Sequence, residues 1–111
     1  MRVEPCPLDE TVPVFFVEDG DEGRAVDMLA TRGHAYCAYG DGIEPFIVFD
    51  SRCESYDWWT KHHTLAVMAH ELGHIKLSSD VEEDADRKGA EILRAAKKHM
   101  AARLLSRRNR D

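Results

Sequence analysis

The segment 67–75 constrains this chain more than any other, because it carries an H-E-x-x-H pattern in a run of residues that predicts a helix. Residues four apart on a helix lie one above the other, so His70 and His74 project from one face and can bind one metal ion. Glu71 lies one step around the helix, where its carboxylate reaches a metal-bound water without binding the metal. That position suits a general base.

The composition around this pattern predicts a buried helix. Glu71 is the only charged residue between Thr64 and His74, whereas a surface helix normally carries charges on one face. Gly73 costs a helix about 1 kcal/mol relative to alanine, a cost that is explained if another backbone or a ligand approaches closely. We therefore predict a catalytic zinc site; the alternative is a helix with no metal or with a purely structural role.

A catalytic zinc ion takes three protein ligands and one water, so two histidines are not sufficient. Glu82 is the favoured third ligand, because it begins a helix that can fold back across the histidine helix. Asp80 is the alternative: it follows His74 by six residues, as in H-E-x-x-H-x-x-G-x-x-H/D sites, although Leu77 stands where that pattern has glycine. Asp86, one turn after Glu82, is expected to accept a hydrogen bond from a ligand histidine. A purely capping role for Glu82 stays open.

Composition indicates one soluble domain of 111 residues. The chain has no apolar run long enough for a membrane helix, and its polar start has no signal-peptide core, so we expect no membrane partner and a cytoplasmic location. The three cysteines, Cys6, Cys37 and Cys53, show no C-x-x-C spacing. They are expected to be free thiols in a reducing compartment.

Charge is distributed unevenly along the chain. Residues 1–86 contain 6 Lys/Arg against 19 Asp/Glu, and residues 87–111 contain 9 against 2. The basic C-terminal segment can neutralise the acidic part of the chain or bind an acidic protein partner. Nucleic acid is not a favoured partner, because no aromatic residues for base stacking are interleaved with the basic ones.

Apolar periodicity and turn residues predict the order of the elements. The predicted elements are an irregular lead-in over 1–10, a strand over 11–17, a helix that ends at Gly33, strands over 34–39 and 43–49, the histidine helix, and a long basic helix over about 81–108. The first strand, the helix and the second strand would form a crossover unit, to which a hairpin at Asp41-Gly42 adds a third, antiparallel strand. The prediction is an α+β fold with a small three-stranded sheet in the order β-α-β-β-α-α.

Two motifs together resemble those of the ImmA/IrrE-like zinc peptidases and, more broadly, the gluzincins. They are His70-Glu71-Leu72-Gly73-His74 and the E-x-x-A-D pattern of residues 82–86, and the resemblance extends over roughly residues 43–93. In that superfamily the second motif provides the third zinc ligand and the residue that orients a ligand histidine. The resemblance implies a minimal zincin-like domain with metal ligands His70, His74 and Glu82, general base Glu71 and orienting residue Asp86.

The same resemblance implies a metalloprotease that hydrolyses peptide bonds in a protein or peptide substrate, with a zinc-bound water as the nucleophile. It also implies that the substrate binds in extended form along a sheet edge, which we expect at Phe46–Phe49. Four residues are open candidates for stabilising the oxyanion: His34, Tyr36, His62 and His63.

Two other classes of function are consistent with the sequence. The chain can be a zincin-fold binding or regulatory module, in which the metal joins two helices and the basic C-terminal helix docks on a partner. It can also be a metal-free component of a complex with an acidic partner or nucleic acid, for which binding would depend steeply on salt.

Overall fold

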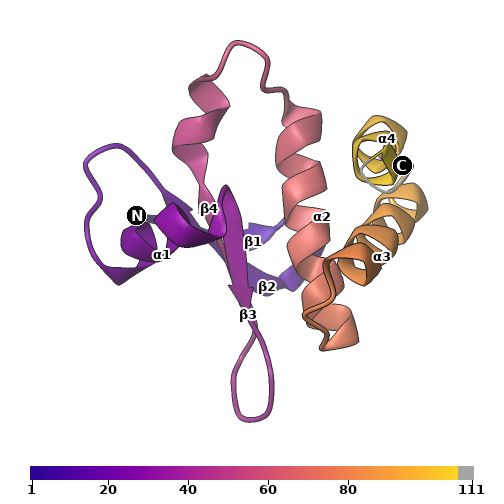
Figure 1. Cartoon of the computed structure of the whole chain (residues 1–111), viewed down its shortest axis with the longest axis horizontal. Helices are drawn as coiled ribbons and strands as arrows, with labels where there is room; N and C mark the ends of the chain where they lie inside the picture. The colour runs from indigo at the N-terminus through magenta and orange to yellow at the C-terminus, as the bar shows by residue number, and fades with distance from the viewer. Residues whose placement is uncertain (108–111) are drawn as a thin grey trace.

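The structure is a computed structural model that describes residues 1–107, and within them it is an α+β protein (Figure 1). The elements in chain order are β1 (Arg2–Cys6), β2 (Asp9–Val17), α1 (Arg24–Arg32), β3 (Ala35–Ala38), β4 (Phe46–Asp50), the 3-10 helix η1 (Ser51–Ser55), α2 (Lys61–Leu77), α3 (Glu82–Ala95) and α4 (His99–Arg107). The predicted α+β class is confirmed, while the predicted number of strands and helices is wrong.

The sheet has four strands in the order β1-β2-β4-β3, so the predicted three-stranded sheet is wrong. The segment 1–10, predicted to be irregular, forms β1 and the start of β2, which pair as an antiparallel hairpin. Pro5 and Pro13 lie opposite each other in this hairpin. Proline is tolerated at both places because β1 is an edge strand and because the pairing of β2 with β4 begins only at Val14.

The parallel partner of β2 is β4, whereas the sequence predicted the segment that forms β3. β3 instead pairs antiparallel with the outer side of β4 and forms an edge of the sheet. Ile47, Val48 and Phe49 are at most 2% exposed, and a run that is buried on both faces belongs in the interior of a sheet. The predicted substrate-binding edge at Phe46–Phe49 is therefore wrong, and the available edge nearest the histidine helix is β3.

Helices cover the two faces of the sheet (Figure 1). Alternate residues of β2 and β4 pack on one face against Met68 and Leu72 of α2. On the opposite face, Val17 and Val48 pack against Leu29 of α1. Helices α3 and α4 lie beyond α2 and pack on its outer side, so α2 is between the sheet and a second layer of helices.

This position explains the composition of α2. Every residue from Met68 to His74 is buried, including the two histidines and Glu71, as the absence of other charges predicted. The helix begins after Thr60, whose hydroxyl accepts a hydrogen bond from the His62 N–H at 3.2 Å. None of the helices in residues 1–107 combines the length and the apolar character needed to cross a bilayer.

The predicted C-terminal helix over 81–108 is interrupted, and its last residue lies outside the described residues. Helix α3 ends at Ala95, Lys97 adopts a positive φ of 60°, and α4 starts at His99. The turn brings Ala102 and Leu105 of α4 into contact with the apolar cluster that contains Leu93 of α3. A straight helix would leave these side chains in solvent, so apolar burial favours the break.

Candidate metal centre

Two histidines of α2 form the base of the site. His70 and His74 are one turn apart and are 5% and 6% exposed. Their Nε2 atoms lie 3.1 Å from each other, with the rings perpendicular. The predicted helical spacing therefore brings both rings to one point, and these rings are buried.

The opposite nitrogen of each ring has an acceptor. His70 Nδ1 lies 2.6 Å from Oδ1 of buried Asp86, and His74 Nδ1 lies 2.6 Å from the backbone carbonyl oxygen of Ser79. A carbonyl only accepts, so His74 Nδ1 donates, and His70 Nδ1 donates to the Asp86 carboxylate in the same way. In the neutral rings both Nε2 atoms then carry lone pairs, which is the arrangement of metal-binding histidines.

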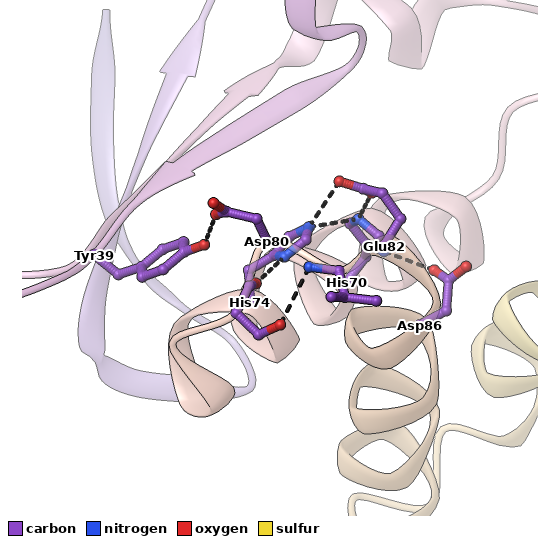
Figure 2. Close-up of polar contacts among 8 residues, drawn as sticks. Tyr39, His70, His74, Asp80, Glu82 and Asp86 are labelled. Atoms are coloured by element: carbon purple, nitrogen blue, oxygen red, sulfur yellow. Dashed lines mark hydrogen bonds and ion pairs between the residues drawn. The ribbon is translucent and has the colours of Figure 1, made fainter.

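Glu82, the first residue of α3, completes the cluster (Figure 2). Its carboxylate oxygens lie 2.7 Å from His70 Nε2 and 3.2 Å from His74 Nε2. With both rings neutral, three acceptors would face one another here, an arrangement that a cation among them would stabilise. The ligand atoms of His70, His74 and Glu82 are all within 4.8 Å of one another, close enough to hold a metal ion. The Glu82 side chain is 69% exposed, so one side of the cluster is open.

Two glycines let α3 lie close to α2. A β-carbon at Gly73 would overlap the backbone carbonyl of Ala85, and one at Gly89 would lie 2.8 Å from the carbonyl oxygen of Ala69. Each glycine faces the backbone of the other helix, as expected for Gly73. This close packing places Glu82 and Asp86, both on α3, over the histidines of α2.

Glu71 lies beside the cluster and is 8% exposed. Burial raises the pKa of its carboxyl group, so the group takes up a proton more readily than an exposed glutamate. Its hydrogen-bond partner is the thiol of Cys37 on β3, which donates to the carboxylate. Burial, together with the negative charge of Glu71, raises the pKa of this thiol and keeps it protonated.

A pocket of about 790 Å³, which we call the metal-site pocket, extends from the cluster along β3. It is lined by residues 32–39, by Val67 and the three polar residues of the α2 motif, and by Asp80 and Glu82. The pocket therefore connects the polar groups of the metal cluster with the edge strand, which forms part of its wall.

Asp80, the alternative third ligand, lines the same pocket but does not join the cluster. Its carboxylate accepts a hydrogen bond from the Tyr39 hydroxyl, on the opposite side of His74 from Glu82 (Figure 2). This bond raises the pKa of Tyr39 to about 12. The Tyr39 ring is nearly parallel to that of His74, with centroids 6.5 Å apart. The structure thus brings Glu82, and not Asp80, to the imidazoles.

Sequence reasoning missed Tyr39 and Cys37. Both lie on or beside β3, and only the position of β3 at the sheet edge brings them to α2. Among the four oxyanion candidates, His34 and Tyr36 line the metal-site pocket, whereas His62 and His63 are not among its lining residues.

Comparisons of the chain with protein-family models, with curated proteins and with solved structures find no match. The resemblance to the ImmA/IrrE-like peptidases therefore remains a prediction that depends on the two motifs.

Proposed function

We propose that the protein is a zinc-dependent metallopeptidase with a minimal zincin-like architecture. The observation that carries the proposal is the convergence of one ligand atom each from His70, His74 and Glu82 on the lining of an open pocket, beside the buried carboxylate of Glu71. Two nitrogens and one carboxylate are a common ligand set of catalytic zinc.

The distances support zinc. Tetrahedral ligands at about 2.0–2.1 Å from an ion are about 3.3 Å apart. The two histidine Nε2 atoms are 3.1 Å apart, and each lies near a different oxygen of Glu82, at 2.7 Å for His70 and 3.2 Å for His74. A rotation of the Glu82 carboxylate would bring one of its oxygens and both nitrogens to that spacing around one ion.

The zinc ion and the side chains would have different roles in peptide hydrolysis. A bound zinc ion would lower the pKa of a coordinated water to about 7 and polarise a substrate carbonyl. Glu71 would accept the proton of the attacking water and pass it to the leaving amine. Asp86 would hold His70 in the tautomer that presents Nε2, and the Ser79 carbonyl would do the same for His74.

Two features favour an enzyme over the alternative of a structural or regulatory zinc module. A structural zinc site is normally closed by four protein ligands, whereas residues 1–107 supply three to this cluster and leave one side exposed. In addition, Glu71 is a buried acid beside the cluster but not within it. A purely structural site has no use for such a group, whose burial is costly.

The proposal is tested by zinc content and by cleavage of an unfolded protein such as reduced, alkylated casein. We expect one zinc per chain and measurable cleavage, which Glu71→Gln lowers by about 100-fold or more while zinc stays bound. Glu83→Gln, a change to an exposed acid of α3, is the matched control and should leave both properties unchanged. Cleavage that survives in Glu71→Gln, or a zinc-loaded protein that cuts nothing, would refute the proposal.

A further inference from the structure

Strand β3 separates two pockets. The metal-site pocket lies along its α2 side, and a second pocket of about 460 Å³ lies between the sheet and α1; we call this the apolar pocket. Tyr36, Cys37, Ala38 and Arg32 line both pockets. Within residues 1–107 the outer edge of β3 has no strand partner. A ligand placed along this edge would therefore contact both pockets.

The apolar pocket is suited to an apolar side chain. Its exposed surface is mostly carbon, contributed by β2, β4 and α1. Phe15 and Phe46 meet edge to face at 5.6 Å, and Met28 of α1 lines the same pocket. These three side chains are half-buried, so a group that fills the pocket would remove apolar surface from water.

The pocket is also lined by two arginines, Arg24 and Arg32, at the two ends of α1. Among the six Lys/Arg of residues 1–86, three form ion pairs with carboxylates: Arg2, Arg52 and Lys76. Arg24, Arg32 and Lys61 form none within residues 1–107, and two of these three line the apolar pocket. In a segment with 19 acidic residues, two cations without counter-ions beside an apolar pocket favour an acidic ligand.

We propose that the apolar pocket selects the polypeptide that is cleaved at the metal site, by accepting an apolar side chain with an acidic residue two positions away. This inference rests on the proposed function. An extended peptide added to the β3 edge has side chains that alternate between the two faces of the sheet. One set faces the metal-site pocket, and the other set faces the apolar pocket and its arginines. Residues two apart share a face, so an apolar and an acidic side chain at that spacing reach the pocket together.

The test measures, by fluorescence anisotropy, how tightly fluorescein-labelled peptides bind to the zinc-loaded Glu71→Gln protein. The probe Ser-Glu-Ser-Leu-Ser-Glu-Ser places acid, leucine and acid on one face in either chain direction. We expect it to bind about fivefold or more tightly than the peptide with lysine in place of glutamate. It should also bind about tenfold or more tightly than the peptide with serine in place of leucine.

Variants identify the surface that is responsible. Arg24→Glu changes an arginine that lines the apolar pocket alone and cancels the net charge of the two arginines, so it should abolish the preference for the glutamate peptide over the lysine peptide. Lys61→Glu, the same charge change at a residue that lines neither pocket, should preserve that preference. Met28→Gln should reduce the leucine preference, and Met100→Gln, an exposed methionine of α4, should not. Thermal melts check that each variant is folded.

The outcomes separate this inference from the proposed function. Absent binding, equal binding of all peptides by the Glu71→Gln protein, or equal effects of Arg24→Glu and Lys61→Glu overturn the assignment of the apolar pocket, even if casein is cleaved. A second outcome is that the peptides show the expected preferences but the zinc-loaded wild-type protein cleaves neither casein nor the leucine probe. This outcome overturns the proposed function, and with it the role of the apolar pocket in substrate selection.

Discussion

Gly73 of α2 packs directly against the backbone carbonyl of Ala85 of α3, so that a β-carbon at residue 73 would overlap the carbonyl oxygen and come within 3.0 Å of its carbon. The contact is between two backbones, and neither can move without displacing its helix. Since Glu82 and Asp86 lie within four residues of Ala85 on the same helix, the separation of α2 and α3 determines the geometry of the metal centre.

Gly73→Ala should therefore weaken both stability and metal binding. Overpacking a rigid contact costs about 1–3 kcal/mol, which opposes a gain of about 1 kcal/mol from the higher helix propensity of alanine. We expect a lower free energy of unfolding in urea and a weaker zinc affinity by competition with a chelator. Gly73→Val should be worse in both assays. Unchanged affinity in both variants would show that the two helices separate freely.

Removal of the metal should lower thermal stability. A ligand present at 100 times its dissociation constant stabilises a folded protein by about 2.7 kcal/mol, which corresponds to about 10 °C in a domain of this size. We expect chelation by EDTA to lower the melting temperature by that order, and added zinc to restore it. The shift should vanish in His74→Ala, and its persistence there would show that zinc binds elsewhere.

Asp86→Asn should weaken zinc binding by about tenfold or more, because the neutral amide no longer provides the charged acceptor for His70 Nδ1–H. Asp84→Asn is a suitable control: it changes an acid on the exposed side of the same helix, where Asp84 pairs with Arg87. Isothermal titration calorimetry on both variants measures the difference. Equal affinities would mean that Asp86 does not orient the histidine.

Tyr39→Phe tests why Asp80 is not a metal ligand. Loss of the hydroxyl removes the hydrogen bond that directs Asp80 towards β3, and we expect a destabilisation of about 1 kcal/mol. The freed carboxylate would then be able to compete with Glu82, so zinc binding in Glu82→Gln should be partly rescued by adding Tyr39→Phe. A double variant that binds zinc no better than Glu82→Gln would contradict this role.

Asp9 connects the start of β2 to Lys76 near the end of α2, with 2.5 Å between the carboxylate and the ammonium. Hydrogen bonds from Lys76 and Thr11 lower the pKa of Asp9 from 3.8 to about 2. Because the folded-state pKa is depressed, the stabilisation is present above pH 3.8 and is lost as the pH falls towards 2. Asp9→Asn should cost about 0.5–1 kcal/mol at pH 7 and progressively less below pH 4, as measured by urea unfolding across this range. A difference that does not change with pH would exclude the ion pair as its cause.

The residues that sequence reasoning located correctly are governed by local geometry. The spacing of His70 and His74 needs only a helix to bring two rings together, and the lack of charges around Glu71 indicates that the helix is buried. The proximity of Glu82 followed from the next helix folding back, with Gly73 as the sign of close packing. The structure bears out this proximity, while the catalytic roles stay predictions.

Three features were determined only by the tertiary structure. They are the identity of the edge strand, the position of the break in the C-terminal helix, and the access of Tyr39 and Cys37 to the metal-site pocket. Each depends on contacts between segments far apart in the chain: β4 is interior because both its faces are covered, and α4 turns back because Leu105 gains burial against α2 and α3. Local sequence patterns specify the periodicity of the elements and the spacing of the ligands. Which segments become buried depends on contacts among all of them, because the buried surface is limited, and these contacts form only when the whole chain packs.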